Sequence, residues 1–93
     1  MEEKFLNAWF AAREQAQALG VRLRPMERRD AMQLARRCLD GHRCSDGFDH
    51  LARLGKLSLT LEALAVKMPY TALFSDEQAN NALQRLLEAG YGF

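Results

Sequence analysis

Residues that favour β-strands are nearly missing from this chain. Its 93 residues include no isoleucine, two valines and two threonines, against fifteen leucines and fourteen alanines. Branching at Cβ favours strands, whereas leucine and alanine lose little side-chain freedom in a helix. An apolar content of 48% is sufficient for a core. We therefore expect an all-α fold, a compact bundle of four to five short helices in a single domain that spans residues 1–93.

Glycines divide the chain into helical segments. Gly20, Gly41, Gly55 and Gly90 each follow a stretch with apolar residues at helical spacing, which is where helices commonly end. The hydroxyl of Ser45 is expected to cap the helical segment that follows Gly41, the third along the chain. The apolar spacing predicts helices over residues 3–19, 26–39, a short stretch from 45, residues 60–67 and a last helix between 75 and 90.

Three local patterns refine this division. Residues 57–61 alternate leucine with polar residues as a strand would, but they have no evident partner strand, so we expect a turn that leads into the next helix. Pro69 opens a brief helical turn that ends near Phe74. Ser75 is followed by Gln78 at the spacing of a capping box, which predicts that the last helix begins there.

The charge balance does not indicate a nucleic-acid or membrane partner. The net charge is +1, and no apolar stretch approaches the roughly 20 residues needed to cross a bilayer. The first residues lack the layout of a signal peptide. Without a secretion signal, the two cysteines are expected to be reduced thiols. We therefore expect a cytoplasmic protein with no membrane partner.

Both cysteines and both histidines fall within one thirteen-residue window that holds Cys38, His42, Cys44 and His50. Two thiolates and two imidazoles are a common ligand set for zinc, but this spacing matches no zinc pattern. Cys38 lies on the apolar face of its predicted helix, where a thiol is an ordinary small apolar group. We favour a core cysteine with polar loop residues. A zinc-stabilised module, or a thiol activated by nearby arginines and His42, is the alternative.

Candidate acid–base residues are few. Asp46, Asp49 and His50 are close in sequence, but Asp46 is better explained as a carboxylate at a helix start. No nucleophile elbow, phosphate loop or paired carboxylates occur. We expect no enzymatic activity and no cofactor.

Arginine is concentrated between residues 21 and 56, where nine Lys or Arg residues stand against five Asp or Glu. A basic surface of this kind can neutralise phosphates or contact an acidic protein. The alternative is that these arginines lie on a solvent-exposed face, whose positive charge is partly balanced by Glu27, Asp30 and Asp40. The arginines concerned are Arg22, Arg24, Arg28, Arg29, Arg36 and Arg37.

The run LSLTLEALAVKMPYTALFSDEQANNALQRLLEAGY, residues 57–91, resembles the core of winged helix-turn-helix domains. In that family a Thr-led helix precedes a second helix that enters the major groove of DNA, and a β-wing follows. The wing is absent here. The resemblance implies a DNA-binding regulator, and Asn or Gln can pair with adenine. Its groove-facing side chains would be Gln78, Asn80, Asn81, Gln84 and Arg85.

Two side chains of the first helix, Leu6 and Phe10, flank its main apolar stripe. If exposed, they are suited to anchor a protein interface; if the helix packs on both sides, they belong to the core. With Arg29, Arg36 and Arg37 they form our candidate partner-binding surface. We predict a small non-catalytic regulatory or inhibitory protein, of the accessory or phage-inhibitor type, that binds another protein. Nucleic acid is the alternative partner, and a homodimer would use Leu6 and Phe10 itself.

Overall fold

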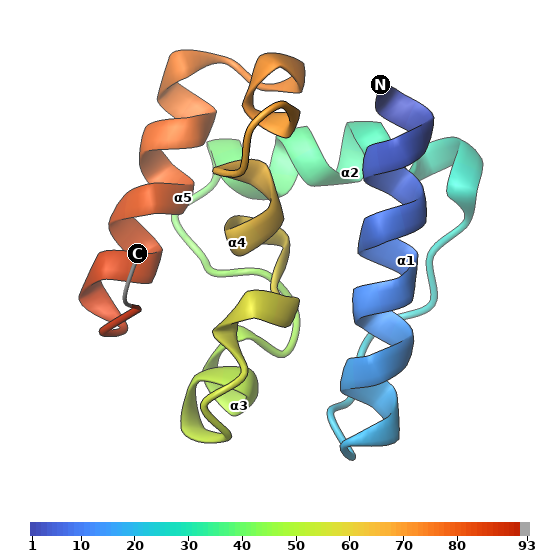
Figure 1. Cartoon of the computed structure of the whole chain (residues 1–93), viewed down its shortest axis with the longest axis vertical. Helices are drawn as coiled ribbons and strands as arrows, with labels where there is room; N and C mark the ends of the chain where they lie inside the picture. Colours follow the sequence, from blue (N-terminus) through green and yellow to red (C-terminus); the bar gives the residue numbers. More distant parts are fainter. Residues whose placement is uncertain (92–93) are drawn as a thin grey trace.

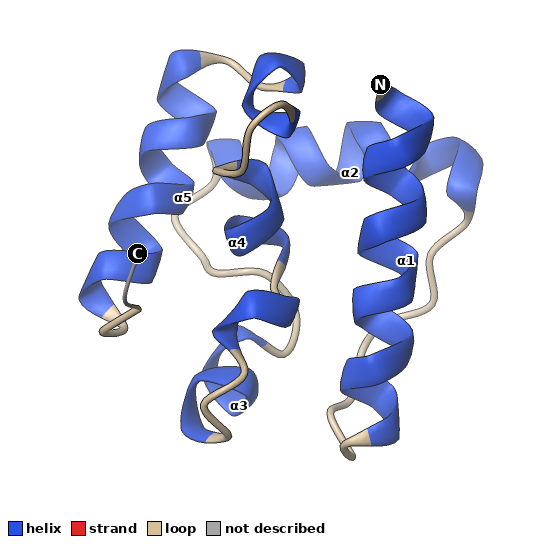
Figure 2. Ribbon diagram, viewed as in Figure 1, coloured by secondary structure: helices blue, strands red, loops and turns tan. Residues whose placement is uncertain are grey.

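All regular structure in the described part of the chain is helical (Figure 2). The computed structural model describes residues 1–91. Its elements are α1 (Glu2–Ala18), α2 (Arg28–Asp40), α3 (Phe48–Arg53), the 3₁₀ turn η1 (Leu57–Leu59), α4 (Leu61–Ala65), the 3₁₀ turn η2 (Tyr70–Leu73) and α5 (Asp76–Glu88). The predicted all-α bundle is confirmed, and these elements form one globule with a radius of gyration of 12.0 Å.

Helices α5, α4 and α1 lie side by side, and α2 crosses behind them (Figure 1). The crossing helix α2 packs on both α1 and α5, and the central helix α4 packs on the same two helices from the other side. All five residues of α4 are buried as a result. Within residues 1–91, no helix has both the length and the apolar character needed to cross a bilayer.

Aromatic side chains hold α1 to the segment between α4 and α5. Phe5 is fully buried, and its ring meets those of Tyr70 and Phe74 edge-on, with ring centroids 5.5 and 5.3 Å apart. Aromatic pairs of this geometry contribute about 0.5–1.5 kcal/mol beyond the area that they bury. The predicted stripe of α1 continues into the core with Trp9 and Ala16.

The starts of α4 and α5 follow the predicted local chemistry. Residues 57–59 form the 3₁₀ turn η1, which leads into α4. The Thr60 hydroxyl caps the first turn of α4 by accepting a hydrogen bond from the Ala63 amide (3.1 Å). The capping box of α5 is confirmed. The amide of Gln78 donates to Ser75 Oγ (3.0 Å), and the Ser75 amide donates to Gln78 Oε1 (2.9 Å).

The start of the third helix differs from the prediction. Helix α3 begins at Phe48 and not at Ser45, because Gly47 precedes it in the left-handed region with φ 78°. A Cβ atom at Gly47 would lie 2.6 Å from a methyl carbon of Val21, so the turn approaches the loop before α2 very closely. Ser45 does not cap α3; its hydroxyl donates instead to the buried carboxylate of Glu62.

Candidate functional site

A cleft of about 370 Å³ opens between α1, α2 and the loops around α3. This volume lies in the range of sites that bind ligands. The chain can line it from distant segments because the loop after α1 runs back behind that helix to α2 (Figure 1). The lining consists of Trp9, Arg13 and Ala16 of α1, residues 23–26, Leu34, Arg37 and Cys38 of α2, residues 44–46, Leu51 of α3 and residues 59–61.

The inner walls of the cleft are apolar. Ala16, Leu51 and Leu61 are almost fully buried, and Trp9 stands beside them. At the opening, Leu34 keeps 38% of its surface exposed. The half-buried Leu23 and the exposed Leu34 therefore supply apolar surface that a ligand could remove from water, at about 25 cal/mol per Å².

Arg13 is the most enclosed cation of the cleft. Its guanidinium donates a hydrogen bond to the carbonyl of Arg24 and lies 5.9 Å from the centroid of the Trp9 ring. Burial lowers the pKa of Arg13, and the nearby carboxylate of Asp46 opposes this shift in part. An arginine keeps its charge under these conditions. The cleft therefore holds a partly desolvated positive charge against an aromatic wall.

The other charges at the cleft are two arginines and one aspartate. Asp46 Oδ2 accepts the backbone N–H of Arg24 (3.4 Å) and lies 3.8 Å from its Nε. Within residues 1–91 neither Arg13 nor Arg37 forms an ion pair. Three arginines against one aspartate leave a net charge of +2 at the cleft, more than the +1 of the whole chain.

The wall formed by residues 44–46 is held by a buried ion pair. Glu62 accepts from both the amide (2.9 Å) and the hydroxyl (2.5 Å) of Ser45. Arg85 pairs with the same carboxylate and donates a second set of hydrogen bonds to the carbonyls of Cys38 (3.1 Å) and Gly41 (2.6 Å). The loop between α2 and α3 is therefore fastened at several points, and the cleft is pre-formed on this side.

The two thiols of the cleft are not activated as nucleophiles. Burial, with a further contribution from the Glu62 carboxylate, raises the pKa of Cys38 from 9.0 to about 11. Burial also raises the pKa of Cys44, although this residue is more exposed. A reactive cysteine requires the opposite shift. The direction of both shifts argues against the alternative of a thiol activated by neighbouring arginines and His42.

The four residues of the zinc alternative do not lie together in the structure. Among residues 1–91, no three His, Cys, Asp or Glu side chains come together as a group that could hold a metal ion. Cys38 and Cys44 line the cleft, whereas His42 and His50 do not. These four residues are close in sequence but do not converge, so they do not supply the tetrahedral ligand set of a structural zinc site.

Three of the five α5 residues that we predicted to contact DNA are used inside the fold, whereas Asn80 and Gln84 are exposed. Gln78 Nε2 donates to Asp40 Oδ1 (3.0 Å), and Asn81 Nδ2 donates to the Leu39 carbonyl (2.8 Å), both at the end of α2. Arg85 is only 9% exposed in its ion pair. Of this set, Gln84 is exposed and bonds only to Glu88. The prediction of a free reading face on α5 is corrected accordingly, because that face packs on α2.

Of the two alternatives for Leu6, the structure shows the buried one. It is 8% exposed and belongs to the core, because α1 packs on α2 as well as on α4 and both 3₁₀ turns. Phe10 is half-buried, with the Arg28 guanidinium 5.9 Å from its ring centroid. It lines a second, shallower hollow of about 630 Å³ that adjoins the cleft at Arg13.

The predicted arginines do not form one continuous surface. Arg29 pairs with Glu27 (2.8 Å) on the exposed side of α2. Arg36 is half-buried and donates to the Leu73 carbonyl (3.1 and 3.2 Å), so it ties α2 to η2. Arg37 alone of the three lines the cleft.

Sequence analysis missed Arg13, Asp46 and Leu34 as site residues. The spacing of Trp9 and Arg13 by one helical turn was a usable signal, because it places both on one face of α1. No family model, curated protein or solved structure matches this chain significantly. A function must therefore be argued from the geometry and charge of the cleft.

Proposed function

We propose that this is a non-catalytic regulatory or inhibitory protein that acts by binding another protein, and that the cleft is its docking site. The observation that supports this most is the apolar surface that the half-buried Leu23 and the exposed Leu34 present to the cleft, which arginines also line. Apolar centres with polar or charged rims are typical of protein interfaces, in which arginine and tryptophan are enriched.

DNA binding is the less supported alternative. Gln78, Asn81 and Arg85 are held by hydrogen bonds within the fold, which removes most of the side chains that would read bases from α5. A basic surface alone would give affinity for phosphates without sequence preference. The raised pKa values of Cys38 and Cys44 support a role other than nucleophilic catalysis.

Two exposed leucines on two 13-residue helices provide a matched test. Leu34 lies on α2 at the rim of the cleft, and Leu87 lies on α5 away from it; they are 38% and 57% exposed. We expect Leu34→Glu to reduce recovery of the partner by at least roughly tenfold, whereas Leu87→Glu leaves it unchanged. The measurement is a quantitative pull-down from nuclease-treated lysate of the cells that produce the protein, with circular dichroism to verify folding.

The proposal is contradicted if both variants recover the same proteins as the unmodified chain. It is also contradicted if every captured protein disappears after nuclease treatment and nucleic acid is recovered instead. That second result would favour the DNA-binding alternative, and a steep loss of affinity with salt would then be expected.

A further inference from the structure

We infer that the cleft selects a segment of a partner protein that is both acidic and apolar, with aliphatic side chains between the apolar walls and carboxylates at Arg13 and Arg37. This inference rests on the proposed function and specifies the chemistry of the partner. Three observations support it: the excess positive charge, the arrangement of Arg13, and the apolar walls.

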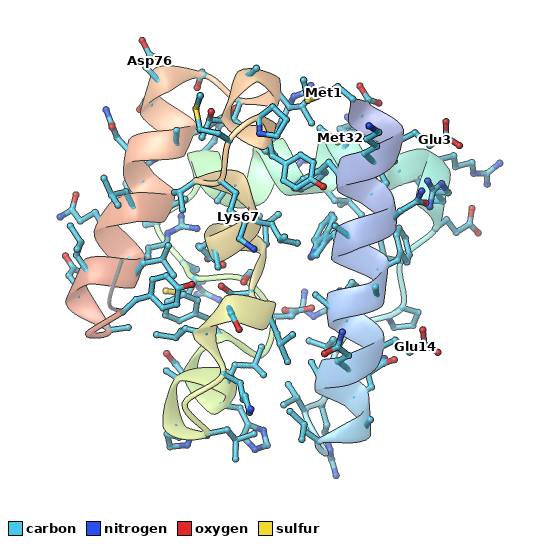
Figure 3. All side chains as sticks on the ribbon, viewed as in Figure 1. Met1, Glu3, Glu14, Met32, Lys67 and Asp76 are labelled. Carbon is cyan, nitrogen blue, oxygen red and sulfur yellow. The ribbon has the colours of Figure 1, made fainter. Side chains whose placement is uncertain are left out.

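The charge of the cleft is not balanced from within the described chain. Outside the cleft, Arg29 and Arg85 have carboxylates at 2.8 and 3.2 Å. In the cleft, Arg24 lies 3.8 Å from the carboxylate of Asp46. The side chains of Arg13 and Arg37 have no carboxylate within ion-pair distance in residues 1–91. The acidic residues of α1 do not compensate. Glu3 and Glu14 project from the outer side of that helix (Figure 3), and neither lines the cleft. Opposite charge on a partner would complete this site.

Arg13 is held in place before any ligand arrives. Its bond to the Arg24 carbonyl and its position over Trp9 restrict the side chain, so less entropy is lost when it binds a carboxylate. Because the guanidinium is already partly desolvated, a hydrogen bond to a carboxylate is stronger there than in open water. An apolar ligand without charge would leave the positive charge of Arg13 without a partner.

The apolar walls of the cleft favour an acidic peptide over a nucleic acid as the anionic partner. Phosphates of a nucleic acid could approach the arginines, but they would leave Leu23 and Leu34 exposed to the solvent of the cleft. A peptide segment can place leucine-like side chains against the apolar walls and carboxylates at the arginines. An amphipathic helix that places apolar residues in a groove is a common mode of such recognition.

The test uses synthetic peptides and the fluorescence of Trp9, which lines the cleft and is the chain's single tryptophan. The probe is a helical peptide of about 18 residues with leucine on one face and glutamate on the other, long enough to form a helix. One control replaces every glutamate by lysine, and another replaces every leucine by glutamine. We expect saturable binding of the acidic peptide, and binding at least roughly tenfold weaker for each control.

Two arginine variants of the full chain localise the effect. Arg37→Glu should weaken binding of the acidic peptide at least roughly tenfold, whereas Arg29→Glu, which makes the same change in net charge on the same helix, should weaken it less than about twofold. Raising salt from about 0.1 M to about 1 M shortens the Debye length from about 10 Å to about 3 Å and should weaken this binding as well.

Three results would overturn the inference. The acidic peptide fails to bind, the lysine peptide binds equally well, or Arg37→Glu and Arg29→Glu have equal effects. Self-association of the chain that is abolished by Leu34→Glu, measured by sedimentation, would also overturn it, because the occupant of the cleft would then be a second copy. None of these results depends on the pull-down. A partner lost with Leu34→Glu but indifferent to Arg37→Glu leaves the proposed function standing and removes only the acidic specificity.

Discussion

Arg85 Nη1 lies 3.2 Å from Glu62 Oε2, and this pair joins α5 to α4 in the interior of the molecule. The Glu62 side chain has no exposed surface, and that of Arg85 is 9% exposed. Two buried charges are tolerated only where hydrogen bonds satisfy their remaining atoms. Here the carboxylate also binds Ser45, and the guanidinium also binds two backbone carbonyls of the loop after α2.

Removing one partner of this pair should be strongly destabilising. In Glu62→Ala the guanidinium of Arg85 stays buried without a counter-charge, and we expect the free energy of unfolding to fall by about 3–5 kcal/mol. The double variant Glu62→Met, Arg85→Met should recover much of this loss, because apolar side chains can replace a buried ion pair. Urea denaturation of the single and double variants measures both effects.

Glu88→Ala provides the control for this cycle. Glu88 is an exposed acid on α5, so its removal should change the free energy of unfolding by no more than about 0.5 kcal/mol. If Glu62→Ala lowers the free energy of unfolding by less than about 1 kcal/mol, the buried guanidinium of Arg85 does not need the Glu62 carboxylate as its counter-charge.

Gly47 should tolerate alanine much less well than Gly55 does. Both have positive φ values, 78° and 71°, so both substitutions carry the backbone strain of about 1–2 kcal/mol. At Gly47 the added Cβ would also lie 2.6 Å from Val21 Cγ1 and 2.9 Å from Leu23 Cδ2, whereas nothing lies within 4 Å of a Cβ at Gly55. We expect Gly47→Ala to cost at least about 1 kcal/mol more.

Thermal unfolding of the two glycine variants measures this difference. Leu23 also lines the cleft, so Gly47→Ala should reduce any binding at the cleft, and Gly55→Ala should not. Equal melting temperatures for the two variants would show that the close approach to the loop before α2 does not constrain position 47.

The helices could be predicted from the sequence because their signals are local. The spacing of apolar residues in α1 and the capping box at Ser75 depend on neighbours within one or two turns. The start of α3 could not be predicted in this way. The close approach of Val21 requires glycine at position 47, and α3 begins after this glycine. Ser45 therefore does not cap α3, although its residue type favours that role, and it bonds to Glu62 instead.

Buried polar residues were the main source of error in the predicted site. Gln78, Asn81 and Arg85 occupy one face of α5, and polar residues on a helix face normally indicate solvent. A usable signal lay in α4, where Glu62 is the one charged residue of a short, otherwise apolar helix. That pattern indicates a buried acid and hence a cationic partner, but the identity of that partner, 23 residues away, is set by packing alone.

Cys38 should make the stability of the protein depend on alkaline pH. Its folded-state pKa of about 11 lies above the ordinary value of 9.0 because burial disfavours the thiolate. The stability that it contributes is therefore fully present below about pH 9 and is lost as the pH rises through about 11. We expect the free energy of unfolding to fall less between about pH 8 and about pH 10.5 in Cys38→Ala than in the unmodified chain.

Because the two proteins differ only at position 38, the difference between their stability curves isolates Cys38. Alkylation gives a second readout: near pH 8, iodoacetamide should modify the exposed Cys44 before Cys38, with both slower than a free thiol. Parallel stability curves for the two proteins would show that the thiol is not desolvated.

Thr60 should contribute more to stability than its small size suggests. Its hydroxyl accepts the Ala63 amide (3.1 Å) at the start of α4 and donates to the Leu57 carbonyl (2.7 Å), with only 2% of the residue exposed. Valine has nearly the same shape but makes neither hydrogen bond, so the Ala63 amide would be left buried without an acceptor. We expect Thr60→Val to lower the free energy of unfolding by about 2 kcal/mol.

Thr71→Val is the matched control, because the Thr71 hydroxyl contacts only the sulfur of Met68, at 3.8 Å, and this contact is exposed. Its loss should change the free energy of unfolding by less than about 0.5 kcal/mol. Urea midpoints with unchanged slopes would attribute the difference to the folded state. If the two valine variants unfold at the same urea concentration, the Thr60 hydroxyl does not hold the first turn of α4, and the apolar burial of that helix is sufficient to fix it.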